Sequence, residues 1–202
     1  MLIGLTGGIA AGKSTVLSML ERAGAHIIDA DKVAREVVAP GTDASRALLA
    51  EFGERVFTAN GQLDRAALAE LVFDDDEAYA RLTAIQYPLI TEAIREKTAS
   101  ITSQDPSAVV VLDAPMLLES GIAREVDEVW VVTAPEAKRI ERARVRSGLT
   151  PDQVLARIRR QVSERERLAG ADRIIVNDGS ITKLETQVAA CWCEIKEKEL
   201  TD

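Results

Sequence analysis

The feature that most constrains the fold of this chain is a glycine-rich segment near its start, Gly7-Gly8-Ile9-Ala10-Ala11-Gly12-Lys13-Ser14-Thr15. The apolar run Leu2–Thr6 before it predicts a β-strand, and the apolar spacing after Lys13 predicts a helix that Gly24 ends. A second apolar run, residues 25–31, then ends in acids. The order strand, helix, strand indicates a parallel sheet that carries helices on both faces.

The spacing from Gly7 to Gly12-Lys13-Ser14 matches the Walker A pattern, in the context of strand and helix that the pattern requires. Its glycines let successive backbone N–H groups turn toward a phosphate, and the helix N-terminus adds about half a positive charge. In such a loop Lys13 reaches the β- and γ-phosphates, and the Ser14 hydroxyl binds Mg²⁺. The predicted ATP contacts of the loop are Gly8, Ala10, Ala11, Gly12, Lys13, Ser14 and Thr15.

Acidic residues end two further predicted strands. Asp29 and Asp31 close the second strand, and Asp113 closes the run 108–113. Ligands of open α/β sheets bind at the carboxyl ends of the strands. Asp29 or Asp31 could accept a proton from a hydroxyl that attacks the γ-phosphate, or could cap the following helix. Asp113 has the position of the acid that holds Mg²⁺, with a strand-end cap as the alternative.

The segment from residue 139 to 167 is rich in arginine. The arginines are Arg139, Arg142, Arg144, Arg146, Arg157, Arg159, Arg160, Arg165 and Arg167. Most of them are predicted to form a solvated helix face, paired with Glu141, Glu164 and Glu166. Arg142 and Arg146 lie four residues apart and therefore on one helix face. Two guanidinium groups that point the same way suit a lid that closes over a triphosphate and neutralises charge as it develops.

The sequence pattern between residues 31 and 103 differs from that of the rest of the chain. It predicts helices at Asp31–Val38, Thr42–Phe52, Asp64–Phe73 and Glu77–Ser100, and it is too long for a simple crossover between two strands. We expect a helical insert over residues 31–103 in one domain, 1–202. The core would comprise residues 1–30, 104–147 and 170–202, and the lid residues 148–169. Later strands are expected at 108–113, 128–133 and 173–177, and later helices at 135–147, 150–168 and 181–199.

Composition narrows the choice of partners. The chain has 33 acidic and 25 basic residues, a net charge of −8, and so lacks the basic footprint of a nucleic-acid binder. Its apolar runs are too short to cross a bilayer, and its first residues lack the pattern of a signal peptide. We expect a cytoplasmic protein, monomeric or weakly homo-oligomeric, that binds small molecules and neither nucleic acid nor membrane.

Taken in order, these residues resemble dephospho-CoA kinases, a small-molecule kinase branch of the P-loop nucleoside triphosphate hydrolase superfamily. Beyond the Walker A loop, the resemblance rests mainly on Ile28-Asp29-Ala30-Asp31 with Ala34-Arg35, and on Asp113-Ala114-Pro115-Met116-Leu117-Leu118-Glu119. Further matches are Pro88-Leu89-Ile90, Arg142, Arg146, Gln161, Ala171-Asp172, Asn177 and Gly179. The family usually has histidine where this chain has Tyr87.

The resemblance, with the five strand patterns, implies an α/β, three-layer P-loop kinase fold with a five-stranded parallel sheet, a helical substrate-binding insert and a helical lid. It implies Mg²⁺-dependent transfer of the ATP γ-phosphate to the ribose 3′-hydroxyl of dephospho-CoA, the last step of coenzyme A synthesis. By this resemblance Asp31 is the base, and Lys13, Arg142 and Arg146 stabilise the transferring group. Asn177 and Gly179 lie near the adenine. The implied substrate-binding residues are Asp31, Arg35, Tyr87, Pro115 and Leu118, and the metal ligands are Ser14 and Asp113.

Two other functions stay open on the residues alone. One is a P-loop kinase that acts on a nucleoside, a nucleotide or a sugar acid. The other is a nucleotide-dependent switch or assembly factor, which predicts slow ATP turnover and no phosphorylated small product. The pairing of Asp31 with an arginine lid favours a kinase, because a switch requires no acceptor base.

Overall fold

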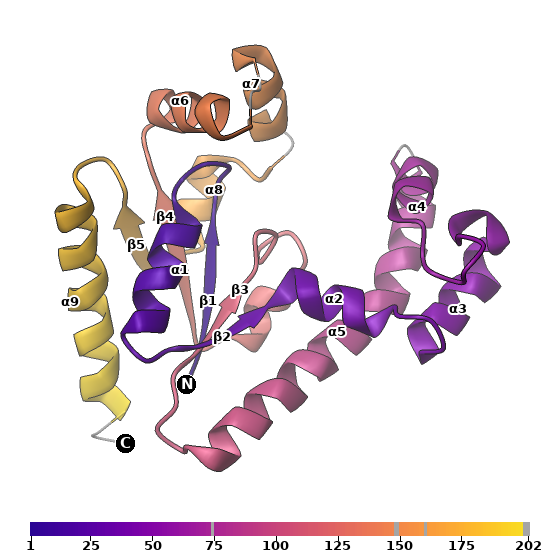
Figure 1. The fold of residues 1–202 in the computed structure, drawn as a ribbon, viewed down its shortest axis with the longest axis horizontal. Coiled ribbons are helices and arrows are strands. Elements are labelled where there is room, and N and C mark those ends of the chain that lie inside the picture. The colour runs from indigo at the N-terminus through magenta and orange to yellow at the C-terminus, as the bar shows by residue number, and fades with distance from the viewer. Residues whose placement is uncertain (74, 148–149, 160, 200–202) are drawn as a thin grey trace. The chain divides into compact units, whose positions relative to one another are not determined.

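The structure, a computed structural model, describes residues 1–73, 75–147, 150–159 and 161–199 (Figure 1). The chain folds as two compact units, which are described separately below. The first unit comprises residues 1–28 and 100–202, and the second comprises residues 29–99. Within the described ranges, no helix is long and apolar enough to cross a membrane.

The first unit contains the parallel sheet, whose strand order is β2-β3-β1-β4-β5. The strands are β1 (Leu2–Gly7), β2 (His26–Asp29), β3 (Val110–Asp113), β4 (Glu128–Thr133) and β5 (Arg173–Val176). Ile3 of β1 is in register with Val111 of β3 and with Glu128 of β4, so β1 is the central strand. The predicted five-stranded parallel sheet is confirmed.

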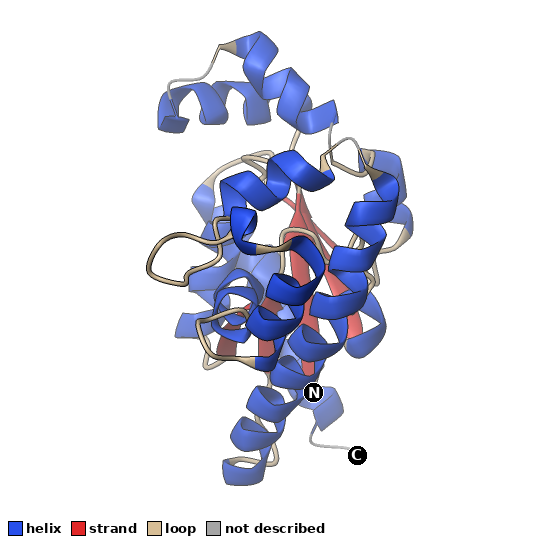
Figure 2. Cartoon of the chain, turned by 90° about the vertical axis from the view of Figure 1, so that its right-hand side faces the viewer, coloured by secondary structure: helices blue, strands red, loops and turns tan. Residues whose placement is uncertain are grey.

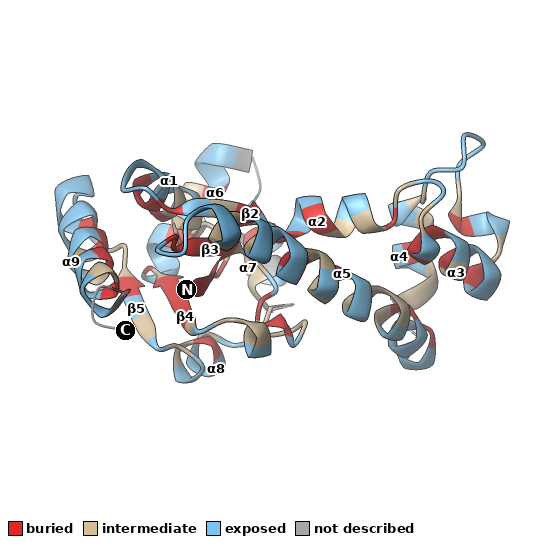
Figure 3. Cartoon of the chain, turned by 90° about the horizontal axis from the view of Figure 1, so that it is seen from below, coloured by how far each residue is buried: buried red, intermediate tan, exposed pale blue. Residues whose placement is uncertain are grey.

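Apolar side chains from alternate strand positions form the core against two helices, α1 (Lys13–Arg22) and α9 (Ile181–Glu199). Ile3 and Leu5 of β1 pack there with Val16 of α1 and Trp192 of α9. On the opposite face, a Cβ placed on Gly4 would lie 2.6 Å from Leu117, so the chain after β3 packs directly on the central strand. All of β1 is buried, which anchors the loop that follows it (Figure 3).

Three more helices follow β4: α6 (Glu136–Ser147), α7 (Pro151–Arg159) and α8 (Glu164–Ala169). The prediction of one helix over residues 150–168 is wrong. Thr150 and Gln153 form the predicted capping box at the start of α7. Ser163 and Glu166 form a second capping box, which starts α8 as a new helix.

The second unit is helical, as predicted (Figure 2). Its helices are α2 (Ala30–Val37), α3 (Asp43–Phe52), α4 (Arg65–Val72) and most of α5 (Asp76–Gln104), with a 3₁₀ turn at Glu54–Val56. Leu48, Phe52 and Leu82 are central to a separate small core. Asp64 caps α4 as predicted, because its carboxylate accepts the N–H groups of Ala66 and Ala67.

Candidate functional site

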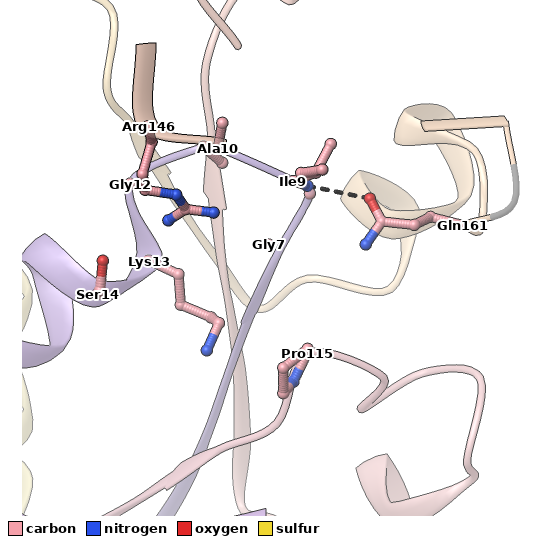
Figure 4. A pocket seen from close by; sticks show the side chains of 11 residues that line it. Gly7, Ile9, Ala10, Gly12, Lys13, Ser14, Pro115, Arg146 and Gln161 are labelled. Carbon is pink, nitrogen blue, oxygen red and sulfur yellow. Dashed lines mark hydrogen bonds between the residues drawn. The ribbon is translucent and has the colours of Figure 1, made fainter. Parts of the chain in front are cut away.

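The glycine-rich segment forms an arched loop between β1 and α1 (Figure 4). Gly12, the residue before α1, has φ 101°, and Ala10 has φ 57°. These left-handed conformations turn the chain back on itself before the helix starts. The arch borders a cavity of about 400 Å³, whose lining comprises residues 7–14, Pro115, Arg146 and Gln161. The predicted phosphate-binding loop is therefore a concave site at the carboxyl end of the central strand.

One backbone N–H of the arch already holds an oxygen atom. The Ile9 N–H donates to the Oε1 atom of Gln161 at 3.0 Å, from the short segment between α7 and α8 (Figure 4). An amide oxygen thus lies where the loop would bind an oxygen of a ligand. The contact also brings the C-terminal part of the predicted lid to the loop.

Lys13 and Asp113 lie side by side. The Lys13 ammonium donates to the Asp113 carboxylate, which stands at the end of β3 beside the central strand. In Figure 4 the Lys13 side chain extends from the base of the arch toward Pro115. The structure therefore brings together the predicted phosphate-binding cation and the predicted metal-binding acid.

Arg142 and Asn177 hold the loop from its outer side. Arg142 Nη2 donates to both the backbone oxygen and Oδ1 of Asn177, each at 3.2 Å. Asn177 Nδ2 donates to the Ala11 carbonyl at 2.9 Å. A Cβ on Gly12 would overlap the Asn177 amide, so this position requires glycine for its space as well as for its φ.

A second hollow, of about 570 Å³, lies on this outer side of the loop. Its lining comprises Ala10, Gly12, Ser14, Thr15, Lys138, Glu141, Arg142, Val145 and Arg146. Arg146 borders both hollows, and its guanidinium lies on the inner side of the arch in Figure 4. The two arginines predicted for the lid are thus both at the loop.

The remaining predicted residues of the first unit lie around this centre. Pro115 lines the first cavity, and its carbonyl accepts the Thr6 hydroxyl at 3.2 Å. Leu118 packs against Gly170. Gly179 lies in the exposed turn after β5. Residues 148, 149 and 160 of the predicted lid lie outside the described residues.

In the second unit, the structure separates the two candidate acids. Asp29 caps α2, since its carboxylate accepts the Lys32 N–H at 2.9 Å. Asp31 lies in the first turn of α2 and is exposed, and its backbone oxygen accepts Arg35 Nε at 3.0 Å. The capping role therefore belongs to Asp29, which leaves the Asp31 carboxylate available for chemistry.

Arg65 lies near Asp31 and Arg35, and nothing in the sequence predicted this. Its Nη2 atom donates to the Ala34 carbonyl at 3.4 Å. Partial desolvation and the charge of Arg35 lower the pKa of Arg65, while the charge of Asp31 opposes that change. Two arginines thus lie close to Asp31. Tyr87 is a half-buried residue of α5 in the same unit.

The prediction of a solvated face is wrong for two arginines. Arg139 and Arg167 are only 3% and 2% exposed, and both donate to Glu164. For Arg139 a signal was present in the spacing, because residues 139, 142 and 146 share one stripe of α6 and each contacts or borders the loop. Charge pairing on an isolated helix could not show that Arg139 is buried while Arg146 on the same stripe is exposed.

Ser14 and Asp113 were predicted to bind Mg²⁺ with the nucleotide. Nucleotide-bound Mg²⁺ takes one or two carboxylates and substrate phosphates as ligands, and otherwise keeps water. The Ser14 hydroxyl is exposed in the first turn of α1, next to Lys13, and Asp113 places a carboxylate against the same lysine. This pair of hard oxygen donors fits the ion.

Comparisons with known proteins give one answer over nearly the whole chain. A family model for dephospho-CoA kinase matches residues 1–183. A dephospho-CoA kinase from Moorella thermoacetica is 45% identical over 195 residues, which cover 96% of this chain and 92% of that protein.

Solved structures agree with this. The structure of TT1252 from Thermus thermophilus shares 34% identity at a TM-score of 0.80, covering 96% of this chain and 97% of that one. A dephospho-CoA kinase from Campylobacter jejuni shares 26% identity at a TM-score of 0.71, covering 98% of each chain. With a matched family model and a relative of this identity along almost its full length, the chain belongs to the dephospho-CoA kinase family.

Proposed function

We propose that this chain transfers the γ-phosphate of ATP to the ribose 3′-hydroxyl of dephospho-CoA, giving coenzyme A and ADP. Membership of the family makes it an ATP-dependent kinase of dephospho-CoA in coenzyme A biosynthesis. The observation that supports this mechanism most is the loop cavity, which is lined by residues 7–14 and Arg146, with Lys13 paired to Asp113. A site of this kind binds the donor phosphates and leaves a carboxylate within reach of a metal ion.

At the ATP-binding side of the proposed site, the role of the protein is to position charged groups. Phosphoryl transfer needs little covalent chemistry from the enzyme, so the rate depends on fixed donors that face the charge of the transition state. We assign this role to Lys13, Arg142 and Arg146, with the loop N–H groups. Mg²⁺ bound with ATP at Ser14 and Asp113 would neutralise charge on the β- and γ-phosphates. Asn177 and Gly179 are assigned to the adenine end.

On the acceptor side, Asp31 is the proposed base. Its carboxylate would accept the proton of the 3′-hydroxyl as that oxygen attacks the γ-phosphate. The use of Asp29 as the cap of α2, and the exposure of Asp31, support the choice between the two acids. Arg35 lies next to Asp31 and suits the anionic pyrophosphate of dephospho-CoA.

The other assigned acceptor contacts are Tyr87, Pro115 and Leu118. Tyrosine is uncharged at neutral pH, so Tyr87 can contribute a hydrogen bond but no positive charge where the family usually has histidine. The cytoplasmic location and the monomeric or weakly associated state expected from the sequence stay predictions.

The test is an acceptor assay with the intact protein. Protein, Mg²⁺-ATP and dephospho-CoA are incubated, and the product is analysed by mass and by the position of the new phosphate. We expect one added phosphate at the 3′-oxygen and one ADP per product. Turnover of a nucleoside or a sugar acid without turnover of dephospho-CoA would overturn the acceptor. ATP turnover without any phosphorylated small product would indicate a switch.

A further inference from the structure

A buried arginine outside the proposed chemistry supports the phosphate-binding loop from behind. Arg139 of α6 is 3% exposed, and its Nε atom donates to the Ile9 carbonyl at 3.1 Å. Its Nη1 atom pairs with Glu164 at 3.0 Å. Arginine is almost never fully buried unless it is paired, because removing its charge from water costs several kcal/mol. Its burial at this point of the loop therefore indicates a specific role there.

The bond to the Ile9 carbonyl determines the direction of the next N–H group. A trans peptide is planar, so its C=O and N–H point to opposite sides. With the Ile9 carbonyl directed at Arg139, the N–H of Ala10 points away from Arg139. Ala10 lines both hollows of the site, whereas Arg139 lines neither. The arginine thus aims the Ala10 N–H toward the space for phosphates.

Ala10 also needs such support. Its φ of 57° is a left-handed conformation, which strains a residue that has a Cβ and persists only where neighbours enforce it. Arg139 holds the peptide that precedes Ala10, and Gln161 holds the N–H of Ile9 one peptide earlier. The strained turn of the arch is therefore fixed by two side chains from the α6–α8 region.

Gly8 is fitted to the same arginine. The Walker A spacing leaves position 8 free. A Cβ built on Gly8 would overlap Nη2 of Arg139 and lie 2.7 Å from its Cζ. Hydrogen bonds to Ile9 and Glu164 hold the guanidinium in place, so it cannot move aside at low cost. Glycine at position 8 is therefore explained by Arg139.

The charges behind the loop do not cancel. Arg139 and Arg167 both donate to Oε2 of Glu164, at 3.0 and 2.6 Å, and the Thr133 hydroxyl donates to its other oxygen. In the ion pairs of the described residues, two guanidinium groups thus share one carboxylate. The excess positive charge is shielded from water, where its attraction for an anion is stronger than at a surface.

We propose that Arg139 is a positioning residue of the phosphate-binding loop. It holds the Ile9–Ala10 peptide with the Ala10 N–H toward the phosphates and adds positive charge behind them. The inference rests on the proposed nucleotide site. Arg139 contacts the phosphate-binding loop, so its loss should weaken binding of ATP and leave binding of dephospho-CoA unchanged.

The first test measures binding of a non-hydrolysable ATP analogue and of dephospho-CoA to Arg139→Gln by calorimetry. Glu164 keeps Arg167 as its partner in this variant, which favours an intact fold. We expect analogue affinity to fall about 10-fold or more, as for loss of a charged hydrogen bond. Arg139→Lys, which keeps the charge, should recover part of the loss. Analogue affinity within about twofold of the parent value would overturn the proposal.

A matched control separates positioning from stability. Arg173→Gln removes another arginine with a largely buried side chain, one that pairs with Glu128 and Glu194 at a place away from the loop. We expect it to lower the unfolding temperature without changing analogue affinity. If Arg173→Gln weakens binding of the ATP analogue as much as Arg139→Gln does, Arg139 affects binding only through the stability of the fold.

The second test is a double-mutant cycle. Gly8→Ala should weaken analogue binding about 10-fold in the parent but much less in the Arg139→Gln background, where the shorter side chain leaves room. Strictly additive effects would contradict the proposal. Lys13→Ala serves as the reference: unchanged affinity in that variant would reject the nucleotide site itself. If only Lys13→Ala weakens binding, the site stands and Arg139 has no positioning role.

Discussion

The Lys13 ammonium is paired with the Asp113 carboxylate at the end of the neighbouring strand. Their side chains are only 17% and 20% exposed, so their attraction is screened less than that of a surface pair. A bound triphosphate would compete with Asp113 for this lysine. In the proposed site, nucleotide binding would therefore exchange one anionic partner of Lys13 for another, and the Asp113 carboxylate would become free to bind a metal ion.

This exchange predicts opposite dependence on metal for two variants. Lys13→Ala should weaken binding of an ATP analogue about 10–100-fold with or without Mg²⁺, because a charged donor is lost. Asp113→Asn should raise the Mg²⁺ concentration for half-maximal activity about 10-fold or more, without weakening metal-free nucleotide binding. Calorimetry and a Mg²⁺ titration of the rate measure the two. An Mg²⁺ requirement unchanged by Asp113→Asn would remove that residue from the metal site.

The two acids at the start of α2 offer a matched pair. Asp31→Asn should lower kcat by at least about 10² with little change in ATP affinity, because the proposed base is lost and the donor site is intact. Asp29→Asn should leave kcat nearly unchanged, since asparagine caps a helix about as well as aspartate. Steady-state kinetics with both substrates measure this. Normal turnover by Asp31→Asn would assign the base to another residue.

Two glycines with the same φ of 101° separate backbone strain from collision. Gly12→Ala places a Cβ into the Asn177 amide, whereas a Cβ on Gly24 has nothing within 4 Å. Gly24→Ala should cost only the conformational strain, about 1–2 kcal/mol of unfolding free energy, with nucleotide affinity retained. Gly12→Ala should lose more stability and also nucleotide affinity. Urea unfolding and calorimetry compare them, and equal effects of the two changes would show that strain alone explains Gly12.

Glu128 should stabilise the protein in a pH-dependent way. Burial raises its pKa, but hydrogen bonds from Arg173, Lys198 and Trp130 outweigh burial and lower the pKa from 4.5 to about 2. A carboxylate whose pKa is lower in the folded state than in the unfolded state stabilises the fold at pH values above the unfolded-state pKa. This contribution is lost as the pH falls toward the folded-state pKa of about 2.

We therefore expect Glu128→Gln to lower the unfolding free energy at neutral pH by at least about 1 kcal/mol. The variant and the parent should converge as the pH falls from 4.5 toward 2. Urea unfolding across this range measures the difference. Glu194→Gln is the control, because Glu194 meets Arg173 from an exposed position and surface pairs contribute little. A difference that stays constant down to the lowest pH would contradict the assigned pKa.

Local sequence patterns predicted the helices and strands of this protein correctly where one short segment contained all the residues that define the element. The five strands, the Asp64 cap and the capping box at Thr150 and Gln153 are all confirmed. The helix expected over residues 150–168 failed because helical periodicity continued across Ser163, while the capping box of Ser163 with Glu166 started a new helix. A local start signal outweighed the periodic one.

The sequence by itself determined that a phosphate-binding loop follows the first strand, because Walker A chemistry depends on residue types at a fixed local spacing. It also predicted site roles for the lysine, the acids and the two lid arginines. Only the tertiary structure decided that Asp113 pairs with Lys13, and that Arg139 is buried behind Gly8. Those outcomes depend on which groups, distant in the sequence, lie close together in the folded chain. The burial and the partners of such a group cannot be predicted from its neighbours in the sequence.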